Sequence, residues 1–181
     1  MDVFFEQIVK KELNSAQKII KIVFIIATVV LIASLVSYAF VLLMANSILA
    51  PICILAAFGA GFGARWYLRR MYIEYEYSIT NGDFDIDRII GKSKRERVIS
   101  TNCQNFEEFG IYDEKAREKL SYREFNAKVM AANLKEEGLY YAVVAHKSIG
   151  SVLVVIQPDE RIRTALKKFM PRFIQNDIFG H

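Results

Sequence analysis

The feature that most constrains this chain is a run of 43 consecutive residues, from Ile22 to Ala64, without a charged side chain. A helix needs about 20 apolar residues to cross the hydrocarbon core of a bilayer, which is about 30 Å thick. The run is therefore long enough for two crossings. Beyond Met71, in contrast, charged residues recur every few positions. The sequence predicts a membrane anchor followed by a domain outside the membrane.

Two transmembrane helices are expected, at about residues 22–45 and 47–68, separated by a polar break at Asn46. The first is dense in Ile, Val, Leu and Phe, whose insertion free energies sum to roughly −5 kcal/mol or better. The second has a core of only 17 apolar residues, from Ile48 to Ala64. It reaches full length when flanking side chains extend to the interface. The alternative is a single span followed by a buried or re-entrant segment.

Basic side chains flank both predicted spans, whereas the turn that joins the spans is uncharged. Because Lys and Arg flanks are retained inside, we expect a multi-pass protein of the cell inner (plasma) membrane with both termini cytoplasmic. The residues expected to anchor the spans at the interface are Lys18, Lys21, Arg65, Trp66, Arg69 and Arg70. The lipid bilayer is thus the first predicted partner.

The net charge of +4 is confined to residues 1–70, which carry seven basic and three acidic side chains. Residues 71–181 carry seventeen of each sign. A basic chain can indicate nucleic-acid binding. Here the excess cations flank the apolar spans, where membrane topology explains them. No nucleic-acid partner is expected.

Residues 1–21 form an amphipathic N-terminal segment before the first span. Apolar residues such as Phe5, Ile8, Val9 and Leu13 recur there at helical spacing, with charged residues among them. One interpretation is a short helix that lies in the cytoplasmic interface. The other is a segment that packs on the soluble domain. The sequence does not separate the two.

The second span contains Gly59, Gly61 and Gly63 in close succession. The spacing resembles part of a dinucleotide-binding fingerprint, but no strand precedes it and no βαβ unit surrounds it. Small residues on a membrane helix permit close packing against a neighbouring helix. We therefore expect packing within the hairpin or between copies of the chain.

Residues 71–181 show the alternation and turn signals of a β-rich domain. Asn81-Gly82 is a strong hairpin turn signal between two such runs. The predicted strands are residues 73–80, 83–90, 95–101, 106–111, 128–132, 139–146 and 151–156. An amphipathic helix is expected at 159–170, with acidic residues in its first turn and Pro171 after its end. The fold class is α+β.

The order of these elements resembles the pleckstrin-homology (PH) superfold, an antiparallel β barrel or sandwich of about seven strands closed by a C-terminal helix. The stretch from Val154 to Pro171 looks like the closing strand and helix of such domains. The stretch from Tyr75 to Asp87, following paired membrane helices, resembles a family of uncharacterised membrane proteins from Firmicutes-type bacteria. The resemblance implies a PH-like cytoplasmic domain and no particular activity.

No residue pattern points to catalysis, a metal or a cofactor. Asp83, Asp85 and Asp87 match the first half of a calcium loop, but Arg88 and Lys94 occupy the positions that require Gly and Glu. These carboxylates are expected on the solvent face of a strand. The chain is predicted not to be an enzyme, and no small-molecule substrate is evident.

Histidine and cysteine are equally uninformative about chemistry. A zinc site or a Ser-His-Asp triad would depend on His146 alone, because His181 ends the sequence. Cys53 falls in a predicted span and Cys103 in the soluble domain, so the two are not expected to pair. This fits a reducing compartment.

One basic cluster lies in the soluble domain, around the turn after the second predicted strand. It consists of Lys92, Lys94, Arg95 and Arg97. It is either a solvated turn or a contact for anionic lipid headgroups, worth about 1 kcal/mol per residue near the surface. PH domains that bind phosphoinositides place basic residues around the first hairpin loop, whereas here that loop is the short, uncharged Asn81-Gly82.

The leading functional hypothesis is a membrane-anchored binding or scaffolding module that engages a protein partner or itself. Exposed strand edges, or the groove beside the final helix, would serve as the contact surface. One alternative is an anionic-lipid surface sensor that acts through the basic turn 92–97. Another is an accessory subunit of a membrane enzyme or transporter.

Overall fold

The computed structural model describes residues 4–179. It divides into two compact units, a helical hairpin at residues 13–72 and a β-rich domain formed by the residues on either side of it. The helices of the hairpin are α1 (Ser15–Met44) and α2 (Ala50–Arg70). The elements of the domain are β1 (Phe4–Lys11), β2 (Ile73–Thr80), β3 (Asp83–Ile90), β4 (Lys94–Asn102), the 3₁₀ turn η1 (Cys103–Asn105), β5 (Phe106–Ile111), α3 (Glu114–Ser121), β6 (Ala127–Met130), β7 (Tyr140–His146), β8 (Gly150–Ile156), α4 (Glu160–Phe169) and α5 (Arg172–Phe179).

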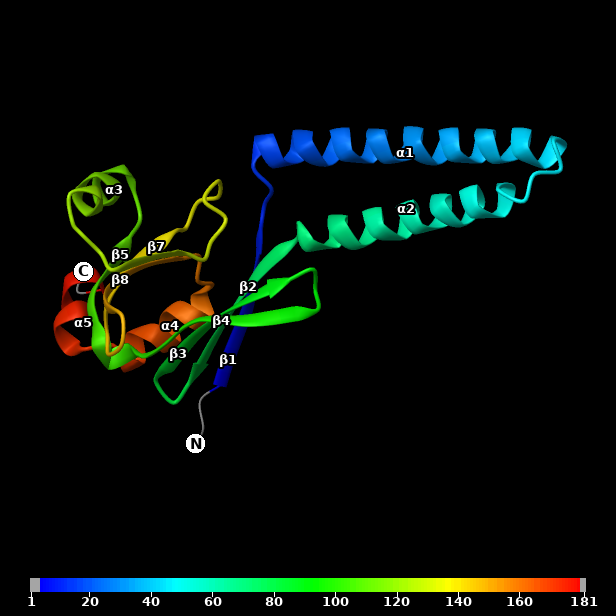
Figure 1. Cartoon of the computed structure of the whole chain (residues 1–181). Helices are drawn as coiled ribbons and strands as arrows, with labels where there is room; N and C mark the ends of the chain where they lie inside the picture. Colours follow the sequence, from blue (N-terminus) through cyan, green and yellow to red (C-terminus); the bar gives the residue numbers. More distant parts are fainter. Residues whose placement is uncertain (1–3, 180–181) are drawn as a thin grey trace. The chain divides into compact units, whose positions relative to one another are not determined.

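In the hairpin unit, α1 and α2 run side by side in opposite directions (Figure 1). Asn14 caps the start of α1: its side chain accepts a hydrogen bond from Ser15 N–H at 2.8 Å, and its own N–H donates to Gln17 Oε1 at 2.9 Å. The helix thus begins seven residues before Ile22, so that Lys18 and Lys21 lie on it. Both helices are long and apolar enough to cross a membrane by length and composition.

Small residues line the contact between the two helices. Ala39 on α1 and Ala50 and Ala57 on α2 are buried, and these side chains allow the backbones to approach closely. A Cβ atom placed on Gly61 would lie 3.6 Å from Ile32 Cδ1 on α1. Gly61 therefore faces the partner helix, as the glycine pattern predicts for packing within a hairpin.

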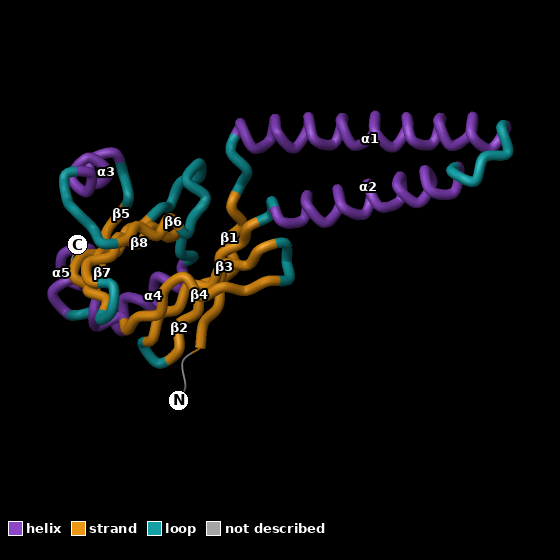
Figure 2. Tube along the Cα trace, viewed as in Figure 1, coloured by secondary structure: helices purple, strands orange, loops and turns teal. Residues whose placement is uncertain are grey.

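Among the described residues of the domain, the strands form two four-stranded sheets, with orders β1-β2-β3-β4 and β5-β7-β8-β6 (Figure 2). Neighbouring strands are antiparallel, except that β6 pairs with β8 in parallel. The sheets are not closed into a barrel. The seven strands expected between residues 73 and 156 correspond to β2–β8, and an eighth, β1, comes from the N-terminal segment.

The structure of the N-terminal segment shows that one interpretation from the sequence, a short helix in the cytoplasmic interface, is wrong. Residues 4–11 form strand β1, not a helix, and pair along their whole length with β2. Phe5, Gln7 and Val9 alternate toward the core, and Val9 is buried. Phe4 and Ile8 are apolar but exposed, and their presence hides the two-residue period. The segment belongs to the domain, although 60 residues of hairpin separate it from β2.

The main core lies between the two sheets and beneath the C-terminal helices. Tyr77, Phe84 and Ile86 come from the first sheet, and Val144 and Val154 from the second, all at most 1 % exposed. Helix α4 adds a stripe of buried residues and packs on β1 and β2. This stripe consists of Ile162, Ala165 and Leu166.

A smaller cluster lies on the other face of the second sheet. Leu120 from α3 packs there with Val143, Leu153 and Val155. These side chains point away from the main core because alternate residues of a strand face opposite sides of the sheet. The second sheet is therefore covered on both faces, which explains its nearly continuous apolar strands.

Candidate functional site

Both connections to the hairpin leave the domain at the same end of the first sheet, where β1 and β3 end and β2 and β4 begin. The register places Lys11, Ile73, Ile90 and Lys94 in one row across the four strands. Lys11 precedes a three-residue link to α1, and Ile73 follows a two-residue link from α2. The turn between β3 and β4 lies at this end and contains Lys92, which has a φ of 62°. We call this row and turn the linker edge.

A cleft of about 410 Å³ opens beside the linker edge. The side chains of Lys10, Glu74, Ile89 and Arg95 form its floor, as successive partners across the four strands. Lys92 reaches it from the turn. Three cations and one carboxylate therefore surround this cleft.

Arg95 forms an ion pair with a buried carboxylate, that of Glu76. Its Nη1 donates to Glu76 Oε1 at 2.9 Å, and its Nη2 lies 2.8 Å from Oε2 without hydrogen-bond alignment. Glu76 is only 6 % exposed. Burial raises the pKa of the Glu76 carboxyl, and the charge of Arg95 opposes this shift. Arg95 thus compensates Glu76 beneath the cleft.

Two of the other three basic residues predicted from sequence, Lys94 and Arg97, are also paired. Arg97 contacts Asp87 at 2.6 Å and Asp85 at 3.1 Å, across the strand pair β3–β4. Lys94 lies 2.6 Å from Glu96. Lys92 is exposed, and no ion pair to it is found among the described residues. Three of the four cations of the cluster are therefore held in separate ion pairs, and Lys92 lies in the turn at its tip.

Glu96 is the carboxylate that pairs with both Lys94 and Arg88. Hydrogen bonds from Lys94 and from Arg88, which is 2.5 Å away, lower its pKa to about 2. The carboxylate consequently stays ionised at any physiological pH. It holds two cations that would otherwise be available to an anion at the linker edge.

A second cleft, of about 500 Å³, follows edge strand β1. Residues 7–10 form one wall, and the loops before β7 and after β8 form the other. Gln7 joins the two walls: its Nε2 donates to Gln157 O at 3.0 Å, and its Oε1 accepts from Asp159 N–H at 2.8 Å. We call this the β1 cleft.

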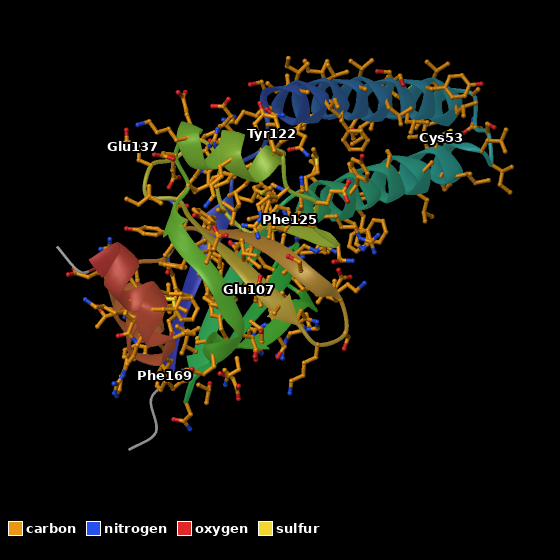
Figure 3. The ribbon with its side chains drawn as sticks, turned by 90° about the vertical axis from the view of Figure 1, so that its left-hand side faces the viewer. Cys53, Glu107, Tyr122, Phe125, Glu137 and Phe169 are labelled. Atoms are coloured by element: carbon orange, nitrogen blue, oxygen red, sulfur yellow. The ribbon has the colours of Figure 1, made fainter. Side chains whose placement is uncertain are left out.

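The far wall of the β1 cleft is acidic, and hydrogen bonds hold part of it. Glu136 accepts from Asn133 at 2.7 Å and from Gln157 Nε2 at 2.7 Å, so both of its carboxylate oxygens are fixed. Asp159 caps α4. Glu137 is exposed at the end of the loop (Figure 3). Lys10 lies opposite these carboxylates.

The sequence did not single out the residues of the β1 cleft. Gln7 and Ile8 lie on a strand whose existence depends on pairing with β2, far along the chain. The signal that could have revealed it is the alternation of Phe5, Gln7 and Val9, together with the short link before α1. The approach of Gln157 to Gln7 follows from tertiary packing alone.

The predicted interface residues lie at the ends of the hairpin where both helices join the domain. Arg70 stacks over the Trp66 ring, 3.7 Å from the ring centroid. Lys21 donates to the Tyr72 hydroxyl at 2.8 Å. Rings with a polar end beside cations are typical of a membrane interface. Arg65 and Arg69 are exposed on α2, and Lys18 lies on α1.

The remaining residues that the sequence raised as chemical candidates have structural roles. Cys103 is buried, and burial raises the pKa of its thiol to about 12, which disfavours the reactive thiolate. His146 Nδ1 accepts from the N–H groups of Ser148 and Ile149 at 3.3 Å, which orders the β7–β8 turn. Cys53 lies on α2 (Figure 3). Within residues 4–179, no group of three or more His, Cys, Asp or Glu side chains could hold a metal ion.

The two packed sheets with a helix across their shared core are consistent with a PH-like domain, the class that the family comparison gives. Such domains bind lipids or proteins and are typically not catalytic. The chain belongs to the bacterial PH-like domain family DUF6106, whose model matches residues 1–176. This match confirms the predicted PH-like bacterial family. No curated protein and no solved structure matches the chain.

Proposed function

We propose that this protein is a membrane-anchored module that binds an extended segment of a protein partner along strand β1. The observation that carries the proposal is the β1 cleft, which lies beside an edge strand of a PH-like domain. An edge strand presents backbone groups that an added strand can pair with. The hairpin acts as the anchor, with both termini in the cytoplasm.

The chain connections support this arrangement. Links of two and three residues span at most about 3.6 Å per residue, so they tether the linker edge within roughly 15 Å of the ends of the helices. A partner bound along β1 is therefore held close to the inner membrane face. This would favour partners that are themselves membrane proteins or are recruited to the bilayer.

The charges of the β1 cleft favour a partner segment that carries a basic side chain. Glu136, Glu137 and Asp159 face a single cation, Lys10, among the residues that line it. The hydrogen bonds of Glu136 come from the neutral amides of Asn133 and Gln157, so its charge is not cancelled, whereas Asp159 is paired with Arg161 at 2.9 Å. Glu137, like Glu136, is exposed, so a bound segment can reach its carboxylate.

Site-specific crosslinking of the full chain in its native membranes tests the proposal. A photo-reactive phenylalanine analogue at Ile8, which is 51 % exposed, should give a discrete adduct with one partner or with a second copy. The same probe at Tyr122, which is 80 % exposed on the surface after α3, is the control. Equal labelling at both positions, or none at Ile8, would contradict a site at β1.

A charge reversal sharpens this experiment. Glu137→Lys should reduce the yield of the Ile8 adduct, because the new cation would repel the basic side chain that the partner segment is expected to carry. Glu107→Lys is the matched control, since Glu107 is an exposed glutamate on β5 (Figure 3). If the adduct is unaffected by Glu137→Lys, the partner does not contact this wall.

A second candidate function rests on the linker edge. Lys10, Lys92 and Arg95 surround a cleft at the edge from which both helices leave, where anionic headgroups would lie. A spin label at Lys92→Cys, with the two native cysteines replaced, should become less accessible to a water-soluble relaxation agent in bilayers with anionic lipid than in zwitterionic ones. A label at Lys147→Cys, in the β7–β8 turn, is the control. Parallel changes at both positions would exclude a specific contact.

A further inference from the structure

An apolar groove of about 450 Å³ lies between α1 and α2. Its walls include Ile32 and Val36 from α1, and Ile54 and Phe62 from α2. The charged residue in its wall is Arg65, at the end of the groove nearest the C-terminus of α2. A groove of this kind in a membrane helix pair must be filled by apolar matter, because water is excluded there.

Gly61 shapes the groove. A Cβ atom there would make ordinary contact with Ile32 at 3.6 Å, so a larger side chain would extend into the space between the helices. Gly59 and Gly63 differ, since a Cβ atom on either would have nothing within 4 Å. The chain therefore offers one glycine inside the groove and two on the open surface of the same helix.

The length of the groove matches one leaflet of a bilayer. From Ile54 to Arg65 the helix rises about 16 Å, at about 1.5 Å per residue. Half of a hydrocarbon core about 30 Å thick is about 15 Å. An acyl chain that lay along the groove would thus extend from the middle of the bilayer to the level of Arg65.

The charge of Arg65 has no counterpart in the hairpin. Residues 13–72 contain no Asp or Glu, so Arg65 has no acidic partner within this unit. Arg70 stacks on Trp66 and Lys21 bonds to Tyr72, whereas no such contact of Arg65 is found among the described residues. An exposed guanidinium beside an apolar groove suits a phosphate whose acyl chain occupies that groove.

We propose that the groove binds an anionic phospholipid of the inner leaflet, with one acyl chain between α1 and α2 and the phosphate on Arg65. The proposal rests on the proposed function only in that the hairpin crosses the bilayer. It assigns a lipid to the hairpin itself, separate from both clefts of the domain. The bound lipid fills the space that Gly61 leaves.

The test is native mass spectrometry of the full chain, purified in mild detergent and offered equal amounts of phosphatidylglycerol and phosphatidylcholine. The unaltered protein should retain one phosphatidylglycerol. Gly61→Leu should lose it by filling the groove, and Gly63→Leu should keep it. Arg65→Gln should weaken retention about tenfold, the scale of one charge-assisted hydrogen-bonded contact, and Arg69→Gln should not.

The controls separate this inference from the proposed function. Helical circular dichroism shows whether each variant keeps the hairpin, and Arg65→Gln tests the site even if Gly61→Leu fails to fold. Equal retention by Gly61→Leu and Gly63→Leu, or no preference for the anionic lipid, overturns the inference. The Ile8 adduct is measured on the same variants. If one of these contrary results is obtained while the adduct persists, the lipid site is wrong and the proposed function stands.

Discussion

The backbone N–H of Gln157 donates a hydrogen bond of 3.2 Å to the hydroxyl of Tyr77, which is fully buried. The same hydroxyl donates to the carbonyl of Ala131. Tyr77 lies on β2 in the first sheet, whereas Ala131 and Gln157 directly follow β6 and β8 in the second. Burial raises the pKa of the Tyr77 hydroxyl, which keeps it protonated as a donor. One phenol thus joins the two sheets next to the β1 cleft, which Gln157 lines.

Removal of this hydroxyl should weaken the domain without changing its shape. Tyr77→Phe leaves the carbonyl of Ala131 and the N–H of Gln157 without their partner in the core. The expected loss in the free energy of unfolding is about 1–3 kcal/mol. Chemical denaturation followed by circular dichroism measures it, with Tyr122→Phe as an exposed control. A loss as small as that of the control would mean that the sheets do not depend on this link.

The β2–β3 turn is expected to tolerate only glycine at position 82. Gly82 has a φ of +97°, and a Cβ atom there would lie 3.2 Å from Phe169 Cδ1 on α4. Gly82→Ala should therefore cost about 1–2 kcal/mol for the left-handed backbone, and more if the Phe169 ring cannot move. Gly138→Ala is the matched control, because its φ is +76° but a Cβ atom would meet nothing within 4 Å. The difference between the two denaturation midpoints isolates the contact with Phe169.

Asp159 should make the stability of the domain depend on pH. Burial pushes its pKa up, but hydrogen bonds from Ile162 N–H and Arg161 outweigh burial and lower the pKa below its ordinary 3.8. Stability from a carboxyl with a lowered pKa is present above the unfolded-state pKa and is lost as pH falls through the folded-state pKa. Asp159→Asn keeps an N-cap but removes the charge. Denaturation at several pH values should show the unaltered protein losing its advantage over Asp159→Asn in acid; a constant difference would contradict this.

Glu96 should restrain the linker edge from binding anions. Glu96→Gln removes the negative charge that holds Lys94 and Arg88. The freed cations should bind anionic bilayers more strongly. A spin label at Lys92→Cys should then be less accessible to the water-soluble relaxation agent in these bilayers than it is in the protein with Glu96. Glu107→Gln, on β5, should leave that accessibility unchanged. Greater accessibility on Glu96→Gln would show that the ion pairs of Glu96, rather than free cations, support contact with the membrane.

Local patterns were sufficient to predict much of this fold. Alternation from Ile73 onward and the Asn81-Gly82 turn predicted β2 and β3, because these strands pair with near neighbours. Strand β1 was not predicted, because its partner lies beyond the whole hairpin and its exposed Phe4 and Ile8 mimic helical spacing. The parallel pairing of β6 with β8 was equally hidden, since no local signal specifies it.

The candidate sites, like the strands, were predictable only where the signal is local in the sequence. The cations at residues 92–97 are visible in the sequence, but their partners are not: Arg95 finds Glu76 and Arg97 finds Asp87 only through the register of three strands. The β1 cleft is assembled from segments about 150 residues apart, as the bond from Gln7 to Gln157 shows. Sequence reasoning identified the charges, and only the tertiary structure could show which of them are already neutralised.

The central claim is that the hairpin crosses the membrane and holds the linker edge at the cytoplasmic face. It is tested most directly by labelling single cysteines with a membrane-impermeant maleimide, after Cys53 and Cys103 are replaced with alanine. Asn46→Cys, in the turn between the helices, should react in intact cells. Lys92→Cys should react only after the cells are opened. The reverse pattern, or recovery of the intact chain as a soluble protein without detergent, would contradict the claim.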